Sequence, residues 1–333
     1  MTTPSAPDSN VRAWLPGFLA VAVIWGASFL FIKIGVRELH PLYVTLGRAG
    51  AGALTLLVAL AVLRDRLPRD PVLWLHLTVV ATVGVALPFT LFGYGEQRVS
   101  SILAGIWNAT TPLVVLPMAV LVFRTERMTA RRGIGLVLGF VGVLVVLGAW
   151  QGLGGAQFTG QLFCFAAAVC YGLSIPYQKR FIAGRPESGL ALSAGQLLVA
   201  TVLLAIIAPL VAGAPPAPTG LSPEVIGSVL ALGALGTGLA FVINLRTIRL
   251  AGASTASTTT YLIPIFAVLI GVLALDEHLA WYQPVGAVIV LLGVAVSQRL
   301  IFRGRRRAAP TNRLRDAVEP EIAVAEPDPA VSR

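Results

Sequence analysis

The chain has 333 residues, of which 56% are hydrophobic and 12% are charged, and its formal net charge at pH 7 is +10. Soluble domains carry about 25% charged residues, so this composition excludes a water-soluble globular fold and predicts a protein dissolved in lipid. The positive charge lies in loops and in the tail and forms no patch suited to nucleic acid, so we expect no nucleic-acid partner.

Apolar runs follow one another along the chain, each long enough to cross a hydrocarbon core about 30 Å thick. We expect ten membrane helices at about 16–36, 41–63, 72–95, 100–123, 132–149, 159–178, 189–212, 224–245, 253–274 and 282–302. The first run lacks a small-residue cleavage site and is interrupted by Gly26 and Ser28, so we interpret it as a membrane span and not as a cleaved signal peptide. The predicted fold is an all-α polytopic membrane protein.

Basic residues in the connections lie mainly on one side of these spans. One set of connections holds Arg64, Arg66, Arg69, Arg124, Arg127, Arg131, Arg132, Lys179, Arg180, Arg185, Arg246 and Arg249. The alternate set holds only Arg37 and Arg98, a bias of twelve against two. The positive-inside rule therefore predicts an inner (plasma) membrane protein of the bacterial type, with both termini in the cytoplasm.

Part of the sequence of the first span is repeated in the sixth span. The segments are "WGASFLFIK" and "YGLSIPYQK", and a shift of 146 places Trp25, Gly26, Ser28, Phe31 and Lys33 on Tyr171, Gly172, Ser174, Tyr177 and Lys179. Shifts of 152 and 151 place Pro112, Glu126, Gly135 and Gly142 on Pro264, Glu277, Gly286 and Gly293. Matches in the same order with a slowly drifting offset indicate a five-helix unit present twice.

A unit of five helices is odd, so the second copy must enter the membrane from the opposite side. We predict repeats at 15–149 and 159–302, joined by an external linker at 150–158. Residues 1–14 and 303–333 are predicted as cytoplasmic tails, the second basic and disordered. Inverted repeats are a transporter architecture, with the substrate site near the midplane between the copies and alternating access to the two sides.

The order of several degenerate motifs resembles the EamA family of the drug/metabolite transporter superfamily. They are "WGASFLFIK", "GRAGAGAL" with Arg48, "WNATTPLVVLPMAVLVFRTER" and "GIGLVLGFVGVLVVLG", and the resemblance covers about residues 15–302. It implies a secondary active carrier, commonly an exporter of amino acids or other small metabolites. It does not identify the substrate.

Three charged residues lie in the outer part of the predicted membrane region: Lys33, Arg48 and Glu96. Two interpretations remain open for the basic pair. Lys33 reaches the headgroups and Arg48 pairs with a neighbouring helix end, or the two form a site for an anionic group such as a substrate carboxylate. Arg48 matches an arginine of many relatives, and the repeat places Gln196 at the equivalent position.

Polar and aromatic residues nearer the midplane are candidates for the substrate path. From both halves they include Trp25, Ser28, Trp107, Asn108, Thr111, Tyr171, Ser174, Tyr177, Asn244, Thr259 and Tyr261. Pro112 and Pro264 are expected to break their helices and to free the carbonyls of Asn108 and Thr260. Hydroxyls that bond within their own helix and aromatic side chains that fill the core are the alternative for several of these residues.

No carboxylate is predicted near the midplane, which disfavours a carboxylate proton relay for cationic substrates and favours neutral, zwitterionic or anionic metabolites. Cys164 and Cys170 are expected to be small core residues, and we predict no metal and no cofactor. The glycines of the fifth and tenth spans allow close helix packing, within one bundle or at a dimer seam, so a monomer and a homodimer both remain open.

Two other functions remain alternatives to a carrier. A passive facilitator or channel would be separated from a carrier by counterflow measurements. An integral membrane enzyme would need positioned acids, bases or metal ligands, and only the short "DEH" segment at 276–278 offers such a group. We therefore expect a transporter and not an enzyme.

Overall fold

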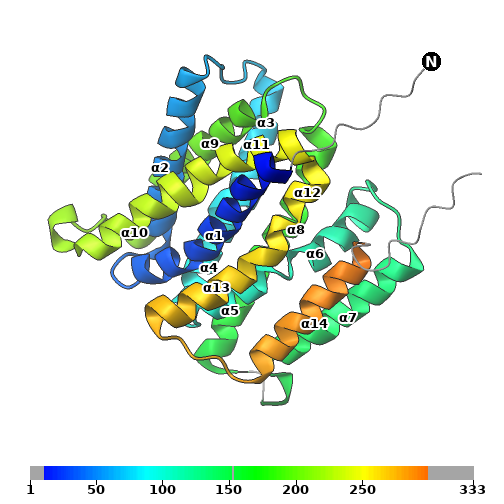
Figure 1. Cartoon of the computed structure of the whole chain (residues 1–333). Coiled ribbons are helices and arrows are strands. Elements are labelled where there is room, and N and C mark those ends of the chain that lie inside the picture. The colour runs from blue at the N-terminus through cyan, green and yellow to red at the C-terminus, as the bar shows by residue number, and fades with distance from the viewer. Residues whose placement is uncertain (1–10, 152–153, 299–333) are drawn as a thin grey trace, which may run out of the picture.

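The computed structural model describes residues 11–151 and 154–298, most of which are helical (Figure 1). The first half contains α1 (Val11–Gly35), α2 (Pro41–Val62), α3 (Pro71–Ala81), α4 (Leu87–Glu96), α5 (Ser101–Asn108), α6 (Thr111–Pro117) and α7 (Ala130–Leu147). The second half contains α8 (Gly155–Phe181), α9 (Gly189–Ala212), α10 (Pro223–Gly233), α11 (Ala240–Ala251), α12 (Ala253–Ser257), α13 (Thr259–Leu275) and α14 (Tyr282–Ser297).

Three π-helical turns and two 3₁₀ turns complete the described backbone. They are η1 (Thr82–Ala86), η2 (Met118–Val122), η3 (Ala149–Gln151), η4 (Pro218–Gly220) and η5 (Ala234–Leu239). Since η1 joins α3 to α4 and η5 joins α10 to α11, the third span of each half carries a π turn, starting 152 residues apart. π turns inside long helices often mark functional sites.

The membrane spans agree with the prediction from hydropathy. Within the described residues, nine helical stretches are long and apolar enough to cross a membrane, and the apolar helix α14 adds a shorter tenth segment. The last four residues of the predicted tenth span and both predicted tails, apart from residues 11–14, lie outside the described residues. The all-helical polytopic fold is therefore confirmed.

Several helices start at a side-chain cap, as their sequences direct. Each capping side chain accepts a hydrogen bond from the backbone N–H of the second or third helical residue, and they are His40, Asp70, Ser100, Thr129, Ser188 and Ser222. Proline follows directly after three of these caps, in α2, α3 and α10. Its fixed φ suits the first helical turn, and no hydrogen bond is lost there.

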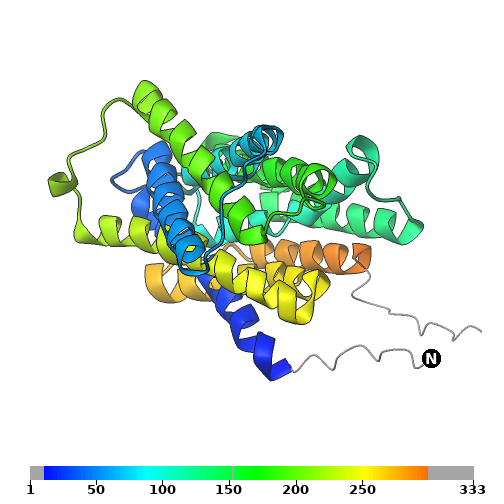
Figure 2. The same ribbon diagram turned by 90° about the horizontal axis from the view of Figure 1, so that it is seen from above.

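Two helices pack against their own repeat mates in antiparallel fashion. At one end of the α2–α9 pair, the Ser188 hydroxyl donates to Asp65, and at the other end the Tyr43 hydroxyl donates to the carbonyl of Gly213. The α7 and α14 helices run side by side in Figures 1 and 2. The two halves are thus inverted relative to each other.

Glycines bring α7 and α14 into close contact. A Cβ atom added to Gly135 would lie 2.5 Å from the carbonyl oxygen of Gly293, and one added to Gly142 would lie 2.6 Å from the nitrogen of Val290. Backbone therefore faces backbone along this seam, which only residues without side chains allow. These glycines form a packing face within the chain.

The fourth and ninth spans are each interrupted near the middle. The first interruption separates α5 from α6 at Ala109 and Thr110, and the second separates α12 from α13 at Thr258. In both breaks a threonine hydroxyl donates at 2.7 Å to the carbonyl three residues earlier, from Thr110 to Trp107 and from Thr258 to Thr255. The same local turn therefore recurs in both halves.

The prediction that Pro264 breaks its helix was wrong in position. Pro112 lies in the first turn of α6, directly after a break, whereas α13 continues through Pro264 and the break lies six residues earlier. A proline inside a helix removes one hydrogen bond but does not have to end the helix when packing holds both sides. The threonine-rich turn at Thr258 sets the break instead.

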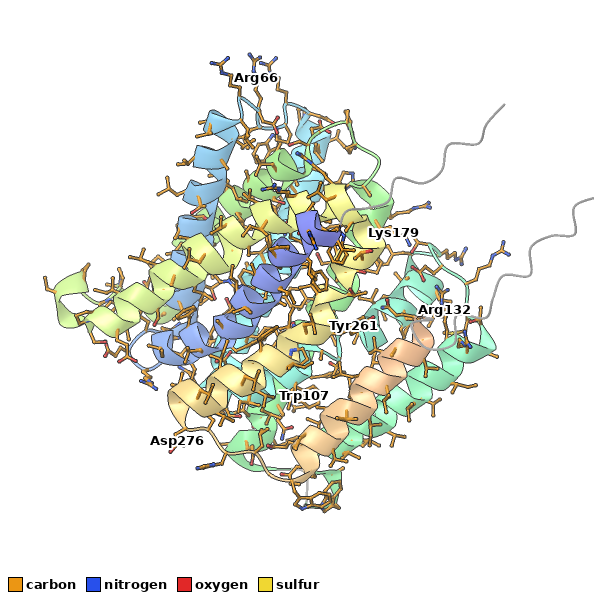
Figure 3. All side chains as sticks on the ribbon, in the orientation of Figure 1. Arg66, Trp107, Arg132, Lys179, Tyr261 and Asp276 are labelled. Atoms are coloured by element: carbon orange, nitrogen blue, oxygen red, sulfur yellow. The ribbon has the colours of Figure 1, made fainter. Side chains whose placement is uncertain are left out.

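The two ends of the bundle differ in charge. Arg66, Arg132 and Lys179 lie at one end in Figure 3 and Asp276 lies at the other, as the alternating connections require. We call the first end the basic face and the second the opposite face. Ion pairs join loops at the basic face, among them Arg185–Asp70 at 2.8 Å, whereas Arg37 pairs with Glu224 at the opposite face.

Candidate functional site

A cavity of about 480 Å³ lies between the two halves, within the usual volume range for small-molecule sites. From the first half it is lined by Trp25, Ser28, Phe29, Ile32, Arg48, Gly84, Val85, Phe89, Phe92, Asn108 and Thr111. From the second half it is lined by Tyr171, Ser174, Ile175, Gln178, Ser193, Gln196, Phe241, Asn244, Leu245, Thr260 and Ile263. The walls therefore come equally from both halves.

Many lining residues are repeat mates of one another. The shift of 146 pairs Trp25 with Tyr171, Ser28 with Ser174, Phe29 with Ile175 and Ile32 with Gln178. Shifts of 148 and 152 pair Arg48 with Gln196, Phe89 with Phe241, Phe92 with Asn244 and Asn108 with Thr260. The cavity therefore lies on the pseudo-two-fold relation between the halves, where inverted-repeat transporters place the substrate.

Arg48 is the cationic group of the cavity wall and is only 8% exposed. Its Nε donates to the hydroxyl of Thr237 at 3.0 Å, and its Cζ lies 3.5 Å from the centre of the Phe89 ring. These two contacts fix the plane of the guanidinium. The side chain has five N–H donors, and in the described part of the chain the Nε–H is the one with a hydrogen-bond partner. The remaining donors are free to bind an anionic group.

Other polar groups of the wall are uncharged. Asn108, Gln178, Gln196 and Asn244 contribute amides, and no Asp or Glu lines the cavity among the residues that the structure describes. The Thr111 hydroxyl is buried at the start of α6 without a hydrogen-bond partner. A buried hydroxyl is costly to leave unpaired, so the start of α6 holds an unsatisfied polar group beside the cavity.

The structure brings most of the predicted path residues to this cavity but not all of them. Trp25, Ser28, Arg48, Asn108, Thr111, Tyr171, Ser174 and Asn244 line it, whereas Lys33, Trp107, Tyr177, Thr259 and Tyr261 do not. The Trp107 indole donates to Gln161 at 3.2 Å inside the core, and the Tyr177 hydroxyl is 2.8 Å from Nδ1 of His76. Tyr261 packs in an apolar cluster beside α14.

Several lining residues were not predicted from the sequence. Phe89, Phe92 and Phe241 supply aromatic surface, and Gln178 and Thr260 supply polar groups. The repeat offset would have found Gln178, because it is the mate of Ile32 one turn after Ser28. Residues 11–151 and 154–298 contain no group of three or more His, Cys, Asp or Glu side chains placed to hold a metal ion.

Matched positions show that the cavity is more open toward the basic face. Phe29, near the opposite face, is 6% exposed, while its mate Ile175 is 46% exposed. Ile32 is buried, and its mate Gln178 is partly exposed. The inverted halves place these mates near opposite faces, so the difference reports which end is closed. The opposite face is closed in this structure.

The carboxylate of Glu277 closes the opposite face by binding the start of α5. It accepts hydrogen bonds from the backbone N–H and the hydroxyl of Ser101, both at 2.8 Å, and from the backbone N–H of Ile102 at 3.1 Å. Because an anion at a helix N-terminus satisfies orphan donors, this contact ties the α13–α14 loop to the first half. Its mate Glu126 instead pairs with Lys179 and Arg132, at 3.0 and 2.7 Å.

Lys33 lies beside this closed end. Its Nζ donates to the carbonyl oxygens of Glu96 and Val99, at 2.5 and 2.7 Å. Lys33 therefore makes the helix-end contact that one interpretation gave to Arg48, while Arg48 contacts the threonine side chain of a neighbouring helix. The two basic side chains do not form a common site.

Glu96 lies at the end of its span, as expected, but it is buried there. Its side chain is 0% exposed, since α8 covers it at the opposite face. Position along a span predicts depth in the membrane, but it does not predict how a neighbouring helix covers the end. The carboxyl group is therefore part of the core.

Comparison with known proteins gives consistent results. The model of the EamA-like transporter family matches residues 12–148 and 158–298. An uncharacterized transporter of Bacillus subtilis, YoaV, is 24% identical over 84% of this chain and 94% of its own length. A probable amino-acid metabolite efflux pump of Salmonella typhimurium is 25% identical over 88% of this chain and 97% of its own.

A solved crystal structure shares the fold. It aligns with a TM-score of 0.60 at 22% identity and covers 87% of this chain and 99% of its own. Together with the two matched ranges of the family model and the ten apolar helical segments, this shows an integral membrane protein made of two repeats. The chain belongs to the EamA-like transporter family.

Proposed function

We propose that this transporter is a secondary active carrier that exports small carboxylate-bearing metabolites, with amino acids and related compounds as the substrate class. The observation that carries the proposal is the Arg48 guanidinium in the wall of a cavity that no carboxylate of residues 11–151 or 154–298 lines. A guanidinium held in plane by Thr237 and Phe89 can donate two parallel hydrogen bonds to one carboxylate.

The rest of the wall suits a zwitterion with an apolar body. Phe89, Phe92 and Phe241 present apolar surface, and the faces of Trp25 and Tyr171 can accept an ammonium group by cation–π contact. The cavity volume of about 480 Å³ limits the cargo to small molecules. The name of the Salmonella typhimurium relative, a probable amino-acid metabolite efflux pump, agrees with this class and with export.

Alternating access follows from the inverted halves. We orient the basic face toward the cytoplasm by the positive-inside rule, so the structure represents an inward-facing state. In the outward-facing state the two halves exchange conformations, and the opposite face opens while the basic face closes. Substrate then enters from the cytoplasm and leaves on the other side.

The test is efflux from cells that express the wild-type protein or the Arg48→Gln variant. We expect wild-type cells to move one or more amino-acid-like metabolites from the internal to the external pool, and the variant to lose that movement at equal membrane abundance. An unchanged metabolite distribution, or export confined to cationic compounds without a carboxylate, would refute the proposed substrate class. Counterflow of labelled substrate separates a carrier from a channel.

A further inference from the structure

Glu96 is a buried acid that does not line the transport cavity. It is the last residue of α4, it is 0% exposed, and neither oxygen of its carboxyl group has a hydrogen-bond partner among the described residues. An ionised carboxylate without a partner in such surroundings costs several kcal/mol, whereas the neutral acid avoids that cost. The C-terminal end of α4 adds partial negative charge beside it.

The charged neighbours of Glu96 do not form a close ion pair with it. The Nζ of Lys33 donates hydrogen bonds to the backbone carbonyls of Glu96 and Val99. The ion pairs within 4.0 Å in the described residues do not include Glu96. Arg48 of α2 and Lys33 of α1 attract a charged carboxylate, while Glu277 repels it. The two neighbouring positive charges therefore attract the Glu96 carboxyl group without donating a hydrogen bond to it.

Close contact between α4 and α8 keeps water away from this acid. A Cβ atom added to Gly95 would overlap the sulfur of Cys164 and would lie 3.1 Å from the carbonyl oxygen of Gly160. Cys164 is the titratable side chain that α8 presents here, and it is itself 0% exposed. Because α4 and α8 belong to different halves, separating the halves at the opposite face opens this contact to water.

We propose that closing the gate at the opposite face binds one proton on the Glu96 carboxyl group, so that the open-to-closed ratio of this gate depends on the pH outside it. The gate consists of Lys33, Glu96, Ser101, Cys164 and Glu277. When the gate opens, water reaches the carboxyl group and accepts the proton as hydronium. This inference rests on the alternating access proposed above.

The sign and size of the effect follow from linkage. The closed gate holds one proton more than the open gate, so acid favours the closed gate and alkali favours the open one. Over the pH range in which the open gate has released its proton, the ratio changes by up to about tenfold per pH unit. The basic face has no equivalent, because the shift of 152 places Ile248 at the matching position.

The native thiol of Cys164 provides a probe that needs no substrate. Cys170→Ala leaves it as the single thiol, and a membrane-impermeant maleimide applied from the opposite face modifies it only when the gate opens. We compare labelling rates of Cys170→Ala and Cys170→Ala/Glu96→Gln between pH 5.5 and 8.5. Dividing the labelling rate of Cys170→Ala by that of Cys170→Ala/Glu96→Gln cancels the thiol ionisation that the two proteins share. We expect this quotient to rise with pH by up to about tenfold per unit.

The matched control is Glu224→Gln, which removes an exposed carboxylate at the same face. Its profile should coincide with that of Cys170→Ala alone. A quotient for Glu96→Gln that stays constant with pH would overturn the proposal. Because thiol labelling needs no substrate, an incorrect substrate class would leave this result unchanged. Failure of the proposed gate and failure of the proposed substrate class are therefore distinguishable.

A second measurement uses the chain without a change at Glu96. Infrared spectroscopy of the purified protein in lipid should show a protonated-carboxyl band at neutral pH that decreases when alkali opens the gate. The sample carries Glu187→Gln, because the buried Oε2 of Glu187 also lacks a hydrogen-bond partner, whereas Asp65, Asp70, Glu126 and Glu277 accept hydrogen bonds or pair with a cation. Absence of the band at neutral pH would contradict the proposal even if Glu96→Gln failed to insert.

Discussion

Replacing Arg48 by glutamine removes the charged donor of the cavity and installs the residue that the repeat mate, Gln196, already carries. The guanidinium can give a substrate carboxylate charge-assisted hydrogen bonds, each contributing about 1.5–3 kcal/mol. Losing one such contribution weakens binding by about 10- to 150-fold, since 1.4 kcal/mol corresponds to a factor of ten. We therefore expect the concentration for half-maximal transport to rise by this factor.

The assay is efflux of labelled amino acids from preloaded vesicles over a range of internal concentrations. Gln196→Met is the matched control, because it removes a neutral hydrogen-bonding group from the equivalent position and should cost about 1 kcal/mol, or about fivefold. Arg48→Lys should fall between wild type and Arg48→Gln, since lysine keeps the charge but not the planar pair of donors.

If the concentration for half-maximal transport in Arg48→Gln vesicles stayed within about twofold of wild type for every tested carboxylate, Arg48 would not bind the carboxylate. A twofold change corresponds to only about 0.4 kcal/mol. Equal losses in Arg48→Gln and Gln196→Met would also contradict this role of Arg48, because the charge would then contribute nothing. Protein amount and elution profile in detergent must match wild type, since Arg48 also contacts Thr237 and Phe89.

Three further predictions concern the gate, the packing and the loops. Glu277→Gln weakens the cap on α5 by about 1–2 kcal/mol, so thiol labelling of the opposite-face gate should increase about 5- to 30-fold, and unchanged labelling would exclude the cap as a latch. Gly142→Ala should lower the thermal unfolding temperature through about 1–3 kcal/mol of overpacking, whereas Gly133→Ala, with nothing within 4 Å of its added Cβ, should leave it equal or higher; equal effects would count against the glycine seam. The backbone N–H of Ser222 lowers the pKa of Glu38, so this carboxylate stabilises the fold above its unfolded pKa of about 4.3 and the stability is lost as pH falls through the lower folded pKa. Melting curves of wild type between pH 3 and 7 should show that acid loss, and Glu38→Gln should show less of it.

The repeat in the sequence predicted much of the fold and part of the site. Trp25 with Tyr171 and Ser28 with Ser174 were predicted from one offset, and both pairs line the same cavity. This works because an inverted repeat places equivalent residues at equivalent distances from its axis. Arg48 followed from the cost of a charge inside a span.

The sequence could not predict which side chains turn toward the cavity and which into the core. Trp107 and Tyr177 are aromatic residues within predicted spans, as Trp25 is. Their hydrogen bonds to Gln161 and His76 hold them away from the cavity. Such contacts join residues more than fifty positions apart. Sequence spacing along one helix therefore cannot show them.

Glu96 shows the same limit for burial. Its position at the end of a span does not indicate whether the group is buried, and the close approach of Gly95 and Gly160 brings α8 over it. Two glycines on separate helices indicate close packing only when their partner is known. The pairing of α4 with α8 is a property of the folded chain.

The most direct test of the inverted-repeat account is a pair of distance measurements by double electron–electron resonance in lipid. One spin-label pair replaces Gln97 and Asp276 on the opposite face, and the other replaces Arg127 and Arg249 on the basic face; each pair joins the two halves. When Glu277→Gln is introduced, the first distance should lengthen while the second shortens. Distances that both stay fixed, or that lengthen together, would contradict a single cavity that opens to the two faces in turn.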